Sequence, residues 1–324
     1  MTRNLIIKVL DMKKLKYMGA LVLAALAGCT KELPTTTPDT SYVPRTELGA
    51  ALAENCPVIA HTYADSSFLV ARGVEETDVH VQLMNGKVEH MFFIKADLND
   101  PGVTLKVGMP YDMDVYSGFQ RQTLSEMASW TDAPGRRVAA MVNADFWDVS
   151  NGDIRGPIHR NGNILKDTFI YSPKLYQQAL SFMAVDWDGK PLIRDSVMYR
   201  PMQEDLKECT GAGVIVLRDG IVPDQTNYPG RDPRTCIGYT DDGIIYMLVC
   251  DGRSQLWSLG LDYEEMGEIM KSLGCSWAVN FDSGGSSQLL IRHPVADVFQ
   301  IRNRPTDGAE RAVVNTWVIS VDEP

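Results

Sequence analysis

A short segment near residue 282 combines one carboxylate with two glycines and several hydroxyls. The segment reads Asn280-Phe281-Asp282-Ser283-Gly284-Gly285-Ser286-Ser287. The preceding run 276–281 predicts a buried strand, and the two glycines allow backbone angles or a close ligand approach that a Cβ would prevent. We therefore expect Asp282 at the exit of a strand, facing a pocket. The alternative is a tight turn in which Asp282 caps its own backbone.

Four further stretches supply groups that an anionic sugar would need. They are residues 142–148, residues 151–157, the pair 234–239 and 247–253, and residues 303–313. Aromatic faces in the first stretch suit the apolar faces of sugar rings, and guanidinium groups suit bidentate contacts with phosphate. The candidate binding residues in these stretches and in the first segment are Asn143, Arg155, Arg234, Arg253, Gly284, Gly285, Ser286, Ser287, Asn303 and Arg311.

The elements that position these residues are mostly hairpins. Short apolar or alternating runs are separated by the turn dipeptides Asn85-Gly86, Asn161-Gly162, Asp188-Gly189, Asp219-Gly220 and Asp242-Gly243. Such dipeptides between strand-like runs are typical of β-hairpins. Because the connections are too short for crossovers, we expect antiparallel pairing.

Few segments show helical periodicity, and two of them stand out. Residues 123–130 begin with Thr123 and carry Glu126 three positions later, as in a capping box. Residues 262–273 place apolar side chains at helical spacing, and Gly274 ends the run as a C-cap. This helix leads directly into the strand that carries Asp282. The sequence therefore predicts an α+β fold, with an antiparallel or mixed sheet built from many hairpins and a few packed helices.

The order of these motifs resembles the phosphodiester glycosidase family. The shared order is Arg-Thr-x-Ile-Gly from Arg234, Asp-Gly, Asp-Gly-Arg from Asp251, a helix, the segment around Asp282, and Asn-x-Pro-x-Asp-Gly-x-x-Arg from Asn303. The similarity covers residues 136–320 and is strongest from Arg234 to Arg311. One departure lies in the first stretch, where the family carries Asn-Gly-Gly and this chain has Asn143-Ala144-Asp145. That change alters how closely backbone can approach a ligand.

The resemblance implies cleavage of a sugar phosphodiester at the anomeric carbon. Phosphate is a good leaving group, so guanidinium groups can provide much of the charge stabilisation. The anomeric carbon develops positive charge and needs a carboxylate, for which Asp282 is the first candidate, Asp251 the second and Asp145 the third. Histidines lack metal-ligand spacing, so the sequence predicts neither a metal site nor a cofactor.

The N-terminus predicts export and lipidation. Lysines precede an apolar run, residues 18–27, that is too short to span a bilayer. The run ends in Leu26-Ala27-Gly28-Cys29, which resembles the bacterial lipobox. We expect a lipoprotein signal peptide over 1–28, a lipid on Cys29, and a tether over 29–46 that is rich in Thr and Pro. A β-rich part over 47–135 and the glycosidase-like part over 136–324 follow. The protein is expected in the cell envelope, at the outer membrane.

The net charge of the chain limits the classes of molecule that it can bind. Residues 1–28 contain five basic and one acidic side chain, so without them the formal net charge falls from −11 to −15. An acidic surface argues against nucleic acid and requires local arginines for any anionic substrate. Two alternatives to a glycosidase remain open, namely a phosphodiesterase that cleaves at phosphorus and a surface glycan-binding lipoprotein without turnover.

Overall fold

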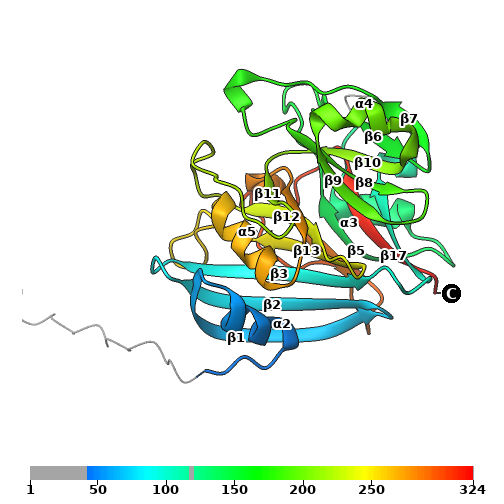
Figure 1. Ribbon diagram of the computed structural model, residues 1–324. Helices are drawn as coiled ribbons and strands as arrows, with labels where there is room; N and C mark the ends of the chain where they lie inside the picture. The colour runs from blue at the N-terminus through cyan, green and yellow to red at the C-terminus, as the bar shows by residue number, and fades with distance from the viewer. Residues whose placement is uncertain (1–41, 117–119, 324) are drawn as a thin grey trace, which may run out of the picture. The chain divides into compact units, whose positions relative to one another are not determined.

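The computed structural model describes residues 42–116 and 120–323 (Figure 1). Residues 40–324 form one compact unit. The expected signal peptide, the lipidation site Cys29 and most of the tether lie outside the described residues. Within the described residues, no helix has the length and apolarity needed to cross a membrane.

The chain consists mainly of β-strands, with short helices between them. The α-helices are α2 (Glu47–Asn55), α3 (Leu124–Thr131), α4 (Tyr199–Met202) and α5 (Tyr263–Ser272). The 3₁₀ turns are η1 (Pro110–Asp112), η2 (Pro173–Leu175), η3 (Ser196–Met198), η4 (Gln203–Asp205) and η5 (Gly284–Ser286). The strands are β1 (Ile59–Ala71), β2 (Val74–Leu83), β3 (Val88–Asp97), β4 (Val103–Gly108), β5 (Arg137–Asn143), β6 (Ile158–Arg160), β7 (Asn163–Lys166), β8 (Ser181–Asp186), β9 (Pro191–Asp195), β10 (Leu206–Ala212), β11 (Ile215–Leu217), β12 (Arg234–Tyr239), β13 (Ile244–Cys250), β14 (Trp277–Asn280), β15 (Leu289–Arg292), β16 (Phe299–Ile301) and β17 (Thr316–Val321).

The strands form three antiparallel sheets. The first has the order β1-β2-β3-β13-β12-β14-β11, the second β7-β6-β10-β8-β9, and the third β16-β15-β5-β17-β4. Strands from the expected parts 47–135 and 136–324 share sheets, because β3 pairs with β13 and β4 pairs with β17. The predicted α+β class with antiparallel hairpins is confirmed.

Most predicted hairpins form at their turn dipeptides. Strands β2 and β3 flank Asn85-Gly86, β6 and β7 flank Asn161-Gly162, β8 and β9 flank Asp188-Gly189, and β12 and β13 flank Asp242-Gly243. The dipeptide Asp219-Gly220 closes only an isolated bridge between Arg218 and Ile221. The strand there, β11, pairs instead with β14. Long-range pairing therefore replaces the expected local hairpin.

Both predicted helices form with the expected caps. Helix α3 has a complete capping box between Thr123 and Glu126, and Asp262 with Glu265 forms a second one at the start of α5. Gly274 has a positive φ of 82° immediately after the C-cap of α5. Helix α5 lies over the first sheet and shares a buried cluster with it through Met266, Ile269 and Met270 (Figure 1). This packing holds the start of β14 and, through it, the segment around Asp282.

The cysteines are core residues. The five cysteines of the described chain, Cys56, Cys209, Cys236, Cys250 and Cys275, are buried and free. Burial raises the pKa of each of these thiols. They therefore act as small apolar side chains in the protein core.

Candidate active site

The candidate site lies where strands of different sheets end against one another. The backbone N–H of Asp282, just after β14, donates to the carbonyl of Ala144, just after β5, at 2.9 Å. Asn143 fixes this junction because its Nδ2 donates to the Asp282 carbonyl at 2.7 Å, while its Oδ1 accepts from Thr235 Oγ1 at 2.7 Å. Asn143, which we expected to bind the substrate, is thus a buried residue whose hydrogen bonds join two strand ends. It brings the strand ends that carry Asp145 and Asp282 together.

Asp145 is enclosed by two glycines. Gly156 N–H donates to Asp145 Oδ2 at 2.7 Å, whereas Asp145 Oδ1 is buried without a hydrogen-bond partner in the described structure. A Cβ on Gly211 of β10 would lie 2.5 Å from Oδ2, so only glycine fits there. Burial raises the pKa of Asp145 to about 7, against the lowering effects of the Gly156 N–H and the Lys166 charge. The neutral carboxyl is therefore the form that this position favours.

Asp282 is only partly buried and is surrounded by donors. Ser283 N–H donates to Asp282 Oδ1 at 2.9 Å. Burial raises the pKa of Asp282 to about 6, and hydrogen bonding from Ser286, the Ser283 N–H and the Arg311 charge limit the rise. Asp282 thus has more donors than Asp145 to stabilise its ionised form. Neighbouring carboxyls with pKa values that burial separates are the arrangement in which one serves as acid and the other as base or nucleophile.

The two glycines after Asp282 make room for the protein's own arginines. Gly284 has a φ of 66°, and a Cβ there would lie 2.7 Å from Arg253 Nη2. A Cβ on Gly285 would collide with the Arg311 guanidinium. The Gly284 N–H is also occupied, because it donates to the Pro233 carbonyl at 3.0 Å. The close approach expected at these glycines is therefore made by guanidinium groups.

Three of the four expected arginines are already paired with carboxylates. Arg253 Nε donates to Asp232 at 2.6 Å, Arg311 Nε to Asp307 at 2.7 Å, and Arg155 Nη2 to Asp148 at 3.1 Å. Arg311 additionally reaches Ser286 Oγ at 3.4 Å. Each pair reduces the positive charge that its arginine can offer to a substrate.

Arg234 is the exception. It is buried, with 6% of its surface exposed, and it donates only to neutral oxygens. These oxygens are the carbonyls of Leu261 and Gly230, the hydroxyl of Tyr263 at 3.0 Å and the hydroxyl of Ser283 at 3.4 Å. Among the residues that the structure describes, no carboxylate pairs with Arg234. A buried guanidinium without a counter-ion is costly, so this position favours an anionic ligand.

Asp251 and Asn303 hold neighbouring loops together. Asp251 is buried and accepts from Trp257 Nε1 at 2.7 Å, from Asn303 Nδ2 at 3.1 Å and from the Arg304 N–H at 2.8 Å. Asn303 also donates to the Ser287 carbonyl at 3.0 Å. The Ser287 hydroxyl is buried without a partner in the described structure. Both Asp251 oxygens are therefore occupied in a network that ties the loop beginning at Asn303 to the turn after Asp282.

One neighbouring cation was not predicted from the sequence. Arg121 is exposed, and its guanidinium carbon lies 4.9 Å from the centre of the Trp147 ring. Hydrogen bonding from Trp147 in turn lowers the pKa of Asp282. No ion pair joins Arg121 to a carboxylate within residues 42–116 and 120–323. Its position follows from the bridge between Gln122 and Val313, which joins segments about 190 positions apart and leaves no local signal.

The comparison with protein families defines the class of this chain. Residues 136–320 match the phosphodiester glycosidase family. The match covers more than half of the chain, and the protein belongs to this family. The site described above lies within the matched residues, apart from Arg121.

Individual relatives agree with this assignment. The chain is 30% identical over 211 residues to the SPbeta prophage-derived uncharacterized protein YomE of Bacillus subtilis, an alignment that covers 62% of this chain and 30% of that protein. This chain therefore spans less than a third of YomE. Its structure resembles the catalytic domain of zebrafish N-acetylglucosamine-1-phosphodiester alpha-N-acetylglucosaminidase, auto-inhibited by its pro-peptide, with a TM-score of 0.58, 15% identity and coverage of 84% and 85% of the two chains. A hypothetical protein from Synechocystis matches with a TM-score of 0.57, 15% identity and coverage of 80% and 64%. At these identities the solved structures show a shared fold.

Proposed function

We propose that this chain hydrolyses a sugar-1-phosphodiester at the anomeric carbon and releases free sugar. One observation carries the proposal: two neighbouring carboxyls, Asp145 and Asp282, have pKa values that burial raises to about 7 and about 6. Burial favours the protonated form of Asp145, whose Oδ1 has no partner in the described structure, whereas the donors around Asp282 favour its ionised form. Membership of the family supports the same class of reaction.

The roles follow from charge. The ionised Asp282 stabilises positive charge at the anomeric carbon, as base for water or as nucleophile. In the direct route, water oxygen bonds to carbon, its proton moves to Asp282, and the electron pair of the carbon–oxygen bond leaves with phosphate. Asp145 supplies a proton to that oxygen, and Arg234 stabilises the phosphate charge. In the nucleophile route, Asp282 first bonds to carbon and water then displaces it.

Hydrolysis in ¹⁸O-labelled water tests where the bond breaks. The unit 40–324 would be incubated with the methyl phosphodiester of N-acetylglucosamine-1-phosphate and with other sugar-1-phosphodiesters, with and without EDTA. Label on the sugar is expected, and the product anomer seen by NMR separates the two routes of Asp282. Label on phosphate would instead establish a phosphodiesterase, and tight binding without product on every substrate would establish a glycan-binding protein.

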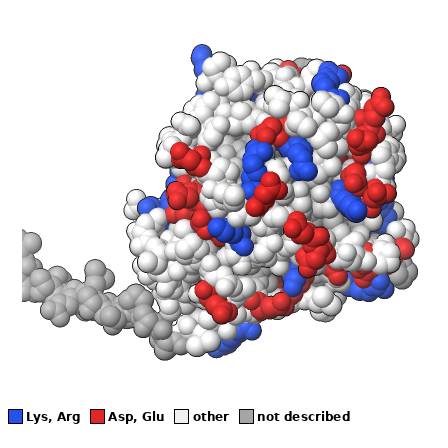
Figure 2. Space-filling view, in the orientation of Figure 1, with Lys and Arg blue, Asp and Glu red and all other residues white. Residues whose placement is uncertain are grey.

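We also propose that the protein is anchored to the outer membrane through a lipid on Cys29. The lipobox-like residues Leu26-Ala27-Gly28-Cys29 support this proposal. Acidic and basic side chains are interspersed on the face shown in Figure 2, which agrees with a small-molecule substrate more than with nucleic acid. Metabolic labelling with a fatty-acid probe is expected to mark the wild type and to leave the Cys29→Ala variant unmarked. Equal labelling of both would contradict the anchor.

A further inference from the structure

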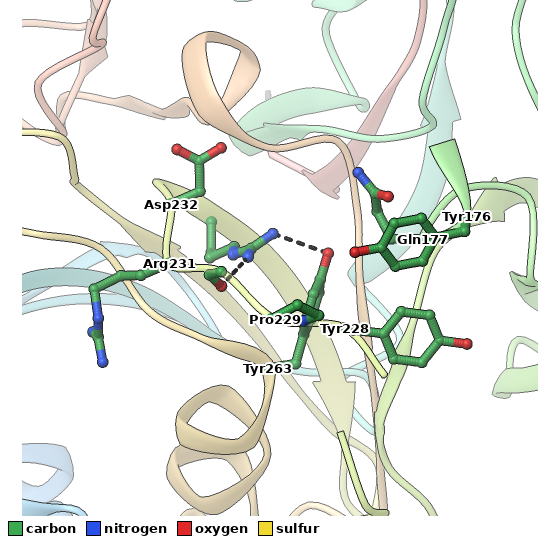
Figure 3. Close-up of a pocket in the computed structure, with 9 residues that line it drawn as sticks. Tyr176, Gln177, Tyr228, Pro229, Arg231, Asp232 and Tyr263 are labelled. Atoms are coloured by element: carbon green, nitrogen blue, oxygen red, sulfur yellow. Dashed lines mark hydrogen bonds between the residues drawn. The ribbon is translucent and has the colours of Figure 1, made fainter. Parts of the chain in front are cut away.

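A cavity of about 270 Å³ is lined by residues of three segments (Figure 3). One of its lining residues, Arg234, reaches the turn after Asp282 through Ser283 Oγ at 3.4 Å. The cavity lining includes Tyr176, Gln177, Tyr228, Asp232, Arg234 and Tyr263. The motifs that identify the family contribute only Arg234 to this set. The remaining side chains come from the loop between β7 and β8, the loop before β12, and the first turn of α5. Apart from Arg234, the side chains that line the cavity have no role in the proposed reaction.

Aromatic rings form one side of this cavity. Tyr176 and Tyr228 are stacked, with ring centres 5.9 Å apart and planes 19° apart. Tyr263 meets Tyr228 edge to face, with ring centres 6.1 Å apart. Figure 3 shows these three rings on the side of the cavity opposite Asp232. The guanidinium carbon of Arg234 lies over the Tyr263 ring, 4.2 Å from its centre, so Tyr176 and Tyr228 are the rings that can offer a π face to a flat ligand.

The opposite side of the cavity is charged, but only one of its charges is uncompensated. Arg231 points away from the cavity (Figure 3) and pairs with Glu89, Asp262 and Glu265. Asp232 is held by Arg253 through two hydrogen bonds of 2.6 and 2.9 Å. Arg234 alone faces the cavity without a carboxylate partner among the described residues. The cavity therefore combines one unpaired guanidinium with an aromatic wall.

Arg234 also connects the cavity to the carboxylates. Its Nη1 reaches Ser283 Oγ at 3.4 Å, and the Ser283 N–H donates to Asp282 at 2.9 Å. A phosphate at Arg234 would thus lie between Asp282 and the tyrosines. The sugar would be on the Asp282 side, so the group on the far side of the phosphate would enter the cavity.

The tyrosine-bearing loop is held against the sheet. The Gln177 carbonyl lies 2.7 Å from the place that a Cβ on Gly213 would occupy. Ala179 has a φ of 57°, a conformation that costs a non-glycine residue free energy. The close approach at Gly213 places the Gln177 backbone against the end of β10.

We propose that this cavity binds the nucleoside of a nucleotide sugar, with the base against Tyr228 and the phosphate at Arg234. A base presents a full π face and carries its polar groups at its edge, where the Gln177 amide can meet them. A second sugar ring could also lie against the aromatic wall, but its several hydroxyls would need polar partners, and Asp232 and Arg231 are already paired. The inference rests on the proposed function for its substrate, but ligand binding tests it without turnover.

Calorimetry on the purified full-length chain tests this inference. The probes are uridine 5′-monophosphate, adenosine 5′-monophosphate and ribose 5-phosphate, which differ in the presence of the base. Stacking predicts that at least one nucleotide binds about tenfold tighter than ribose 5-phosphate. The advantage should disappear in Tyr228→Ala and persist in Tyr228→Phe, which keeps the ring. Tyr171→Ala is the control for loss of an exposed tyrosine, because Tyr171 is 55% exposed on the loop that carries Tyr176 and does not line the cavity.

Two results would overturn the inference. One is equal affinity of the wild type for both nucleotides and ribose 5-phosphate, and the other is equal loss in Tyr228→Ala and Tyr171→Ala. Thermal unfolding of each variant separates lost binding from lost fold. Base-dependent binding without sugar release from any substrate would uphold the inference and reject the proposed function. Release of sugar without base-dependent binding would do the reverse.

Discussion

Each flank of the turn at Asp282 buries an ionisable group, and the two flanks differ in how the charge of that group is compensated. On the β5 flank, burial raises the pKa of Asp145 to about 7, so the carboxyl can lose its charge by taking up a proton. On the β12 flank, Arg234 is also buried but cannot lose its proton, because a guanidinium stays charged in proteins. Its neighbour Arg253 is neutralised by Asp232, whereas Arg234 has only neutral partners within the described residues. The difference indicates that the carboxylate flank is tuned by protonation and the arginine flank by an incoming anion.

Removing the charge of Asp282 should have the largest effect. We expect Asp282→Asn to lower kcat by about 10³-fold or more while leaving the fold intact, because the amide cannot act as base or nucleophile. Sugar release and circular dichroism measure the two properties. Asp241→Asn is the control, since Asp241 is exposed in the turn between β12 and β13. Comparable losses in both variants would contradict the assignment.

The loss of activity on substituting an arginine should depend on whether a carboxylate already pairs with that arginine. We expect Arg234→Gln to lower kcat/KM for a phosphodiester by about 30- to 100-fold, because a charge-assisted contact with the anion is lost. Arg253→Gln and Arg311→Gln should each cost about tenfold or less, since their carboxylate partners already offset their charge. Equal losses at all three positions would reject the distinction between paired and unpaired arginines. Thermal unfolding checks that Arg234→Gln remains folded.

The protonation of Asp145 should appear in the stability of the protein. The fold favours the neutral carboxyl, so this contribution is fully present below pH of about 4, the pKa of an unfolded Asp, and is lost as the pH rises through about 7. Asp145→Asn cannot ionise and should be more stable than the wild type at pH 8 by about 4 kcal/mol. Urea unfolding from pH 4 to 8 measures the difference. A parallel pH dependence in both proteins would show that Asp145 does not have a raised pKa.

The smallest expected effect comes from displacing the Arg311 guanidinium with a side chain at Gly285. A Cβ on Gly285 would displace its guanidinium, so we expect Gly285→Ala to lower kcat/KM by about tenfold. In an Arg311→Gln background the same substitution should cost little, because the displaced group is already gone. A double-mutant cycle with the four proteins measures this coupling. Additive losses would mean that Gly285 acts independently of Arg311.

Local patterns in the sequence predicted most individual elements. The capping box at Thr123 depends on side chains three residues apart, so it is visible in the sequence and forms as expected. The hairpin at Asn85-Gly86 likewise depends on two adjacent residues. The hairpin at Asp219-Gly220 did not extend, because β11 finds a better partner in β14, more than 60 positions away. Pairing over that distance is decided by the packed sheet.

The chemical groups of the site and their order can be read from the amino-acid sequence, because the family motifs are continuous runs in which spacing carries the signal. Asp282 and the glycines that follow it are therefore recognisable as a candidate site from their residue types and order. The packing of distant strands determines which arginine remains unpaired and brings Arg121 over Trp147. It also places Gly211 of the second sheet against Asp145. Burial and counter-ions set charge and pKa, and they exist only once those strands have packed.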